Sequence, residues 1–181
     1  MDKRLEENLR VKNAIANAFL SLLERRTAEE ISISAITAQA HVSRMAFYRN
    51  FTTKLDIIRF YYEDVIFREM ERLLAKEHGE ELYFWSIEYG IAFFTVMKNH
   101  RDTILMLDKM DYSGLLLQAF NETNINLAGD MPANSIERYH IYYAAGASFN
   151  GMLEWLRGGC HESVEDIVES IYSFMNVSYN D

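Results

Sequence analysis

The scarcity of helix-breaking residues is the sequence feature that most constrains this fold. The chain of 181 residues contains one Pro and eight Gly, while 49% of its residues are hydrophobic. Because Pro and Gly are the residues least favourable inside helices, their rarity favours long uninterrupted helices. The hydrophobic share is large enough for a packed core, so disorder is not expected. We therefore predict an all-α protein.

Apolar residues recur at spacings of three and four along most of the chain, which is typical of amphipathic helices. The first such stretch, residues 7–26, has a stripe made of Ile15, Phe19, Leu22 and Leu23. Five further helices are predicted in the C-terminal part, at roughly 82–99, 101–110, 112–126, 134–157 and 163–177. Together with the helices between these two regions, this gives about nine helices.

Two short helices joined by a turn are predicted after the first helix. The stretch "ISISAITAQA" begins with a strand-like alternation, but no partner strand exists, so we favour a short helix with Ser32 as its N-cap. "HVS" is expected to form a turn, and Ser43 caps the helix "RMAFYRNF". Thr53, with Asp56 three residues later, forms a capping-box variant that opens a long helix running to about residue 76.

The charge of the chain is unevenly distributed. Residues 1–60 hold ten Lys and Arg against seven Asp and Glu, a net charge of +3, within a chain whose net charge is −9. The N-terminal third is thus electrostatically different from the rest. We predict two domains, residues 1–60 and 61–181, and a charged, glycine-containing joint at "EHGEEL", residues 77–82.

Signals for export or membrane insertion are not apparent in the sequence. The single cysteine, Cys160, cannot form an internal disulfide, which fits a reducing compartment. We find no signal peptide, and the most apolar stretch, "LYFWSIEYGIAFFTVM", is interrupted by Glu88. These observations predict a soluble cytoplasmic protein without a membrane anchor.

The compact basic and aromatic segment "HVSRMAFYRNFTTK" has a pattern suited to DNA. On a helical wheel, Phe47 and Phe51 share one face, while Met45 and Arg49 lie on the opposite arc. Arg44 sits at the exposed N-terminal end. A short helix preceded by a tight turn and another short helix is the helix-turn-helix arrangement, whose second helix enters the major groove. A basic helix can also be no more than a solvated face.

The stretch "AITAQAHVSRMAFYRNFTTKLDII", residues 35–58, resembles the core signature of the tetracycline-repressor (TetR) family. The positions that match in spacing are Ile36, Ala40, Val42, Ser43, Phe47, Tyr48, Phe51 and Lys54. Two positions depart from the signature: Thr37 stands where the family prefers Ala, and His41 where it prefers Gly. Both lie where the two short helices are expected to cross closely.

The resemblance implies a three-helix DNA-binding domain followed by a helical ligand-binding and dimerisation domain. Base-facing roles carry over to Arg44, Met45, Ala46 and Arg49, and phosphate contacts to Tyr48 and Lys54, with Thr52 or Thr53 beside them. It also implies a homodimeric repressor that binds a palindromic operator in double-stranded DNA and is released by a small-molecule effector. The alternative is a co-regulator of the same fold that acts through a protein partner.

Large soft side chains are dense in residues 83–112, where the resemblance places an effector pocket. The candidate pocket residues are Trp85, Tyr89, Phe93, Met97, Met106 and Met110, together with Tyr143. Met and aromatic side chains line adaptable apolar sites, although most such residues belong to the core. Glu88 could meet a cationic ligand there or be exposed to solvent.

Two helical faces predict how copies of the chain associate. Tyr143, Ala147 and Gly151 share a face with small residues, so another helix could approach closely. The last helix carries a stripe formed by Val164, Ile167, Ile171 and Phe174. These faces could form a four-helix dimer interface, or they could be covered within one chain.

The sequence offers little for catalysis. The five His are scattered, none at the two-His spacing of a helical zinc site, and there is no glycine-rich phosphate loop or nucleophile elbow. Cys160 and His161 are adjacent, but we do not favour a metal site there. We therefore predict no enzyme activity, no metal and no cofactor. The sequence does not identify the effector or the operator.

Overall fold

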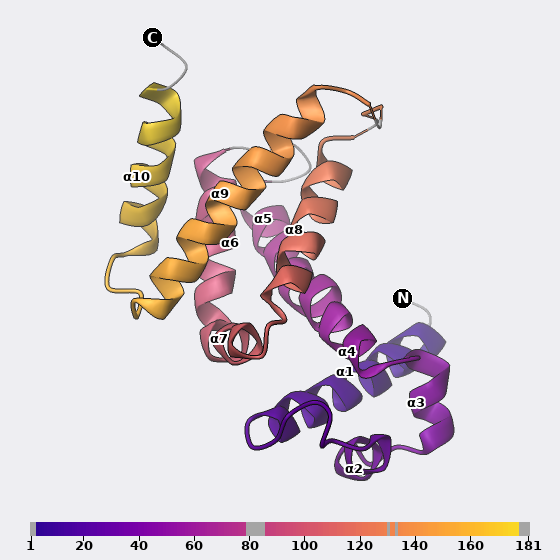
Figure 1. Cartoon of the computed structure of the whole chain (residues 1–181). Coiled ribbons are helices and arrows are strands. Elements are labelled where there is room, and N and C mark those ends of the chain that lie inside the picture. The colour runs from indigo at the N-terminus through magenta and orange to yellow at the C-terminus, as the bar shows by residue number, and fades with distance from the viewer. Residues whose placement is uncertain (1–2, 79–85, 130, 133, 178–181) are drawn as a thin grey trace. The chain divides into compact units, whose positions relative to one another are not determined.

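The computed structural model describes residues 3–78, 86–129, 131–132 and 134–177, with only the backbone described for 76–78 and 175–177 (Figure 1). The chain divides into two compact units, Met1–Tyr62 and Glu63–Asp181, here called the N-terminal and C-terminal units. Throughout the described ranges, all regular secondary structure is helical. The prediction of an all-α fold is confirmed.

Four helices build the N-terminal unit: α1 (Lys3–Leu23), α2 (Ile33–Gln39), α3 (Arg44–Asn50) and α4 (Lys54–Phe60). Helix α1 contacts each of the other three, and α2 contacts α3. Residues 31–32 are loop and α2 follows, so the strand-like alternation forms no strand, and the short helix favoured from the sequence is confirmed. The first helix begins four residues and ends three residues earlier than predicted, because the ends of helices are the least certain part of a sequence-based prediction.

The predicted caps explain where the short helices begin. The Ser32 hydroxyl accepts a hydrogen bond from the backbone N–H of Ala35 at 3.1 Å. At α4, the Thr53 hydroxyl accepts from the Asp56 N–H while the Asp56 carboxylate accepts from the Thr53 N–H at 2.7 Å. Each cap satisfies backbone donors that the first helical turn leaves unpaired. These caps confirm the predicted starts of both helices.

Residues 54–78 are helical without a break, in agreement with the predicted long helix. The segment comprises α4, the π-helix η1 (Tyr61–Phe67) and α5 (Arg68–His78). Counting this segment as one, nine helices run through the described residues. The two compact units divide within η1, between Tyr62 and Glu63, and the expected joint at residues 77–82 lies further along the chain. Most of that joint, from residue 79, lies outside the described residues.

The remaining helices form the C-terminal unit around α6. They are α6 (Ile87–Asn99), α7 (Arg101–Lys109), α8 (Ser113–Leu127), α9 (Glu137–Arg157) and α10 (Val164–Val177). Helix α6 contacts α5, α7, α9 and α10, and its buried side chains lie on several of its faces. A helix that is apolar nearly all round is expected at the centre of a bundle. In the described part of the chain, no helix is both long enough and apolar enough to span a membrane.

Candidate nucleic-acid interface and ligand cavity

Helix α3 presents the side chains predicted to contact DNA. Its buried face is aromatic, with Phe47 fully buried and Phe51 4% exposed. On the outer face, Met45 is 76% exposed and Tyr48 59% exposed. The Ser43 hydroxyl caps the helix by accepting from the Ala46 N–H at 3.1 Å. The inward aromatic residues anchor the helix and leave Arg44 and Arg49 exposed beside Met45 and Tyr48.

The turn between α2 and α3 depends on a histidine with an unusual backbone. His41 has φ of 54°, in the left-handed region where Gly is preferred. Its N–H donates to the Ala38 carbonyl at 3.3 Å, and the Val42 N–H donates to the Thr37 carbonyl at 3.0 Å. This pair of bonds is a Schellman motif, which ends α2 and redirects the chain into α3. Thr37 is accommodated in the core because its hydroxyl donates to the Ser34 carbonyl at 3.2 Å.

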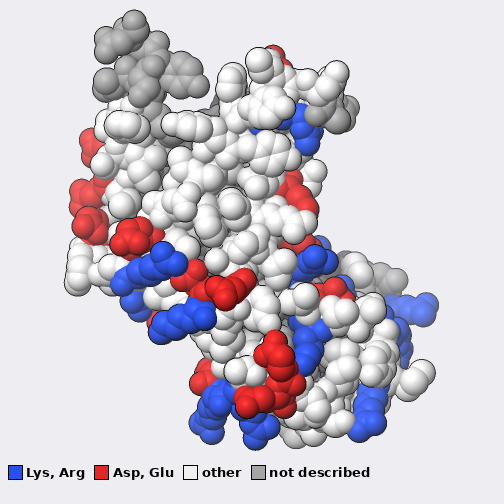
Figure 2. Space-filling view, viewed as in Figure 1, with Lys and Arg blue, Asp and Glu red and all other residues white. Residues whose placement is uncertain are grey.

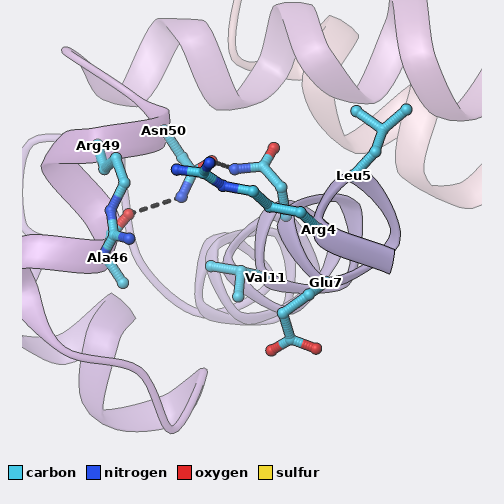
Figure 3. A pocket seen from close by; sticks show the side chains of 8 residues that line it. Arg4, Leu5, Glu7, Val11, Ala46, Arg49 and Asn50 are labelled. Atoms are coloured by element: carbon cyan, nitrogen blue, oxygen red, sulfur yellow. Dashed lines mark hydrogen bonds between the residues drawn. The ribbon is translucent and has the colours of Figure 1, made fainter. Parts of the chain in front are cut away.

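An open groove of about 640 Å³ separates the N-terminal part of α1 from α3 (Figure 3). Its lining includes Arg4 on α1 and Arg49 on α3. Figure 3 shows the Arg4 side chain reaching from α1 toward Asn50, while the Glu7 carboxylate points away. Glu7 instead accepts from Arg10 at 2.7 Å, and this bond lowers the pKa of the Glu7 carboxyl. The groove therefore has two guanidinium groups at its sides.

Most of the residues predicted to contact DNA are exposed in the N-terminal unit. Arg44, Met45, Tyr48, Arg49 and Thr53 are exposed, and Ala46 is half-buried beside Arg49 in the groove. The Arg44 guanidinium contacts the Ser34 hydroxyl on α2.

Lys54 has a structural partner that the sequence did not indicate. Its ammonium donates to the backbone carbonyls of Ala28 and Ile31, the latter at 3.1 Å. These bonds join the start of α4 to the loop between α1 and α2. An ammonium has three donors, and these two bonds use two of them.

Two α1 residues in the groove, Arg4 and Asn8, were missed by sequence reasoning. The Asn8 side-chain amide donates to the Asn50 side-chain carbonyl at 2.8 Å. The net positive charge of residues 1–60 was the only sequence signal for Arg4, and no local pattern pairs Asn8 with Asn50.

The C-terminal unit encloses a small cavity between α6, α8, α9 and α10. Its volume is about 20 Å³, close to that of one water molecule. Phe93, Phe94 and Phe120 supply much of the apolar lining, and Ala144 and Ala145 of α9 complete it. The cavity is therefore enclosed by aromatic rings and small residues.

A polar pair lies inside this apolar lining. The Tyr89 hydroxyl contacts the side-chain oxygen of Asn124, which is 1% exposed. Burial is the main cause that raises the pKa of the Tyr89 phenol, and the nearby Tyr172 raises it further. The pKa of Tyr172 is raised to about 12, mainly by burial and to a smaller extent by the charge of Glu88. Both phenols are therefore neutral at physiological pH.

The predicted effector residues separate into those at the cavity and those elsewhere. Tyr89 and Phe93 line it, and Met97 is fully buried without lining it. Met106 and Met110 belong to α7 and its C-cap and are half-buried away from the lining, while Tyr143 is 76% exposed on α9. Trp85 lies outside the described residues. Sequence reasoning missed Asn124 and Tyr172, whose helices it did not connect with the aromatic cluster.

One wall of the cavity is part of a stack of three rings. The Phe93 and Phe120 centroids lie 4.4 Å apart with an interplanar angle of 14°. Phe120 also stacks on Phe67, at 6.0 Å and 3°. Because Phe67 is the last residue of η1, the stack links the cavity wall to the π-helical segment.

A solved structure shares this arrangement of helices. The chain is similar to the crystal structure of a TetR transcriptional regulator from Streptococcus agalactiae 2603V, with a TM-score of 0.60 and 19% sequence identity. The similarity covers 94% of this chain and 96% of that chain. The chain has the TetR fold. No protein-family model matches it, and no curated protein does.

The TetR fold here leaves a broad, largely uncharged surface over α9 (Figure 2). Tyr139 and Tyr143 are 71% and 76% exposed, and Ala147 is exposed one turn further on. A Cβ added at Gly146 would meet no neighbouring atom. On α10, Val164 and Val168 are buried but Phe174 is 73% exposed. The predicted stripe of α10 is thus covered within the chain at its start and exposed at Phe174.

The described residues contain no group of three or more His, Cys, Asp or Glu side chains that could hold a metal ion. Cys160 is a half-buried free thiol in the loop after α9. In the turn that ends α9, Gly159 has φ of 96°.

Proposed function

We propose that this protein is a DNA-binding transcriptional regulator, acting as a repressor, that reads operator DNA with α3. The observation that carries this proposal is the two-sided character of α3. Its phenylalanines are buried, while Arg49 and Tyr48 are exposed on a helix oriented by the Ser43 cap and the His41 turn. A recognition helix enters the major groove with such a face.

In this proposal some exposed residues contact bases and others contact phosphates. Arg49 donates to guanine O6 and N7 in the groove, with Met45 and Ala46 making apolar contacts to bases. Tyr48, Thr53 and Arg4 hold phosphates, which fixes the position of the helix but carries no sequence information. Arg44 reads bases from the first helical turn and is oriented by its contact with Ser34.

The proposed active form is a homodimer. The uncharged surface of α9 supports this, because Tyr139 and Tyr143 expose aromatic area around the small residues Gly146 and Ala147. Aromatic anchors around a close-approach site are typical of interface cores. A two-fold dimer would place two copies of α3 on the half-sites of a palindromic operator, about 34–36 Å or a multiple of that distance apart.

An effector binding in the C-terminal unit would release the protein from DNA. Such a ligand acts only through different affinities for two arrangements of the protein. The stack of Phe93, Phe120 and Phe67 supports η1 as the element that changes, since π-helical segments inside helices often mark functional sites. The continuous helix 54–78 then acts as the lever.

Selection from a random pool of duplex DNA tests the proposal. We expect enrichment of a two-fold symmetric sequence that the protein binds at nanomolar concentrations in physiological salt. A co-regulator that acts through a protein partner would enrich no sequence. That outcome would overturn DNA recognition in favour of the alternative function.

A further inference from the structure

The cavity between α6, α8, α9 and α10 has a lining without formal charge. Eleven described residues line it, and none is Asp, Glu, Lys, Arg or His. Its polar groups are the Tyr89 and Tyr172 hydroxyls, the Asn124 amide and the Ser148 hydroxyl. Glu88, which the sequence offered as a partner for a cation, is exposed; its charge acts on Tyr172, but it does not itself line the cavity. A charged ligand would find no opposite charge in this lining.

Tyr172 closes the cavity by resting on a glycine. A Cβ added at Gly90 would lie 2.9 Å from Tyr172 Cε2 and 3.0 Å from Val168 Cγ1, so α10 packs directly against the α6 backbone there. The Tyr172 hydroxyl donates to the Ser86 carbonyl at 2.6 Å, and the residue is half-buried. Rotation of Tyr172 outward would free the space of one aromatic ring above Gly90.

We propose that this cavity binds a neutral ligand the size of one aromatic ring, whose amide or hydroxyl group bonds to Asn124 and Tyr89. The ring occupies the space that Tyr172 vacates and packs against Phe93 and Phe94. This inference rests on the proposed function, in which such a ligand is the effector.

Three physical requirements select this class of ligand. Burying an ion without a partner is costly, which disfavours carboxylates and ammonium groups. The raised pKa of both phenols keeps them neutral, so neither supplies a counter-charge to a cation. A wholly apolar ligand that separated Tyr89 from Asn124 would leave buried polar atoms unpaired. A neutral polar group on one ring meets all three.

Calorimetry of the full chain with benzamide, benzoate and benzylamine at pH 7 tests the inference. These probes share one ring and differ in charge. We expect benzamide to bind at least about tenfold more tightly than either charged probe. Equal affinities for the three probes, or no binding of benzamide, would overturn the inference.

Two variants and a matched control locate the site. Asn124→Leu removes the buried amide at similar volume and is expected to lower benzamide affinity at least about tenfold. Asn126→Leu changes an exposed residue on the same helix and is expected to leave the affinity unchanged. Tyr172→Ala opens the wall and is expected to raise the affinity. Unchanged binding in Asn124→Leu and Tyr172→Ala would exclude this cavity. If one variant does not fold, unchanged binding in the other excludes it.

The DNA selection and the benzamide titration together distinguish failure of this inference from failure of the proposed function. Enrichment of an operator without benzamide binding would overturn the ligand class alone. Benzamide binding that Asn124→Leu abolishes, without enrichment of any DNA, would support the cavity and overturn DNA recognition.

Discussion

Asn8 of α1 and Asn50 of α3 share a hydrogen bond, 2.8 Å from the Asn8 Nδ2 to the Asn50 Oδ1. The Asn50 Nδ2 donates in turn to the Ala46 carbonyl at 2.8 Å. The two bonds use both ends of the Asn50 amide and attach the C-terminal turn of α3 to α1. Helix α3 is therefore held by a polar link as well as by its buried phenylalanines.

Removal of this link should loosen α3. We expect Asn8→Ala to lower the free energy of unfolding by about 1 kcal/mol, because a part-buried amide oxygen loses its donor. Operator affinity should fall with it, since α3 would lose its fixed orientation. Urea denaturation measures the first effect, with Asn17→Ala, an exposed change on the same helix, as a control. Equal midpoints for Asn8→Ala and the wild type would contradict this role.

Arg49 and Arg4 should affect DNA binding differently. Arg49→Ala should lose about 1–3 kcal/mol of discrimination at one base pair, because a bidentate contact to guanine is removed. Arg4→Ala should weaken all sequences alike and make the salt dependence shallower by about one unit. Titrations of operator and mutated duplexes at several salt concentrations separate these effects. Arg25→Ala, at an exposed position in the turn after α1, is the control. If Arg49→Ala kept full discrimination, the assignment of Arg49 as a base-reading residue would be wrong.

His41 carries backbone strain that glycine would remove. At φ of 54° a side chain crowds its own backbone, at a cost of about 1 kcal/mol. We expect His41→Gly to raise the unfolding free energy by somewhat less, since glycine also gains entropy in the unfolded chain. His41→Ala keeps the Cβ atom and should bring no such gain. Urea denaturation compares the two variants, and the midpoint of His41→Gly should be the higher. Equal midpoints would refute the role of strain.

The capping box at α4 predicts a pH dependence of stability. The pKa of Asp56 lies below its ordinary value of 3.8, chiefly because its carboxylate accepts from the Thr53 N–H. A depressed folded-state pKa contributes stability above pH 3.8 that is lost as the pH falls through the folded value. Asp56→Ala should therefore cost about 1 kcal/mol at neutral pH. The difference in unfolding free energy between Asp56→Ala and the wild type should become smaller as the pH falls toward about 2. Urea denaturation at several pH values measures this difference, and a difference that stays constant down to that pH would exclude a stabilising role of the Asp56 carboxylate.

A charge at Ala147 should separate the proposed dimer. Ala147→Glu would bury an unpaired carboxylate where two α9 helices approach, and we expect the dimer dissociation constant to rise more than about a hundredfold. Light scattering at micromolar concentration reports the change. Gln118→Glu adds the same carboxylate to an exposed position of α8 and should leave the dimer intact. A monomeric wild type would rule out the interface.

The sequence predicted those features that local interactions determine. Ser32, Ser43 and Thr53 begin their helices as expected, because a cap involves residues only three positions apart. The departure from the signature at His41 correctly marked a position of special backbone geometry. Apolar spacing placed the helices of the C-terminal unit within a few residues of their observed bounds, except where residues 79–85 are not described.

Features that depend on tertiary contacts were beyond sequence reasoning. The bonds from Lys54 to the Ala28 and Ile31 carbonyls join positions more than twenty residues apart, so a phosphate role was all that the signature implied. The π-helical turn of η1 has no sequence pattern of its own. The cavity lining depends on how α8 and α10 pack on α6, which explains why Asn124 was missed and Tyr143 was chosen although it is exposed.

Footprinting of the DNA that flanks the gene for this protein tests the central claim most directly. The account predicts protection of a palindrome whose half-site centres lie about 34–36 Å, or a multiple of that distance, apart along the duplex. Protection should weaken steeply as salt increases and should require a higher protein concentration with Arg49→Ala. Absence of a protected site at micromolar wild-type protein, in low salt, would contradict the claim that α3 is a DNA-recognition helix.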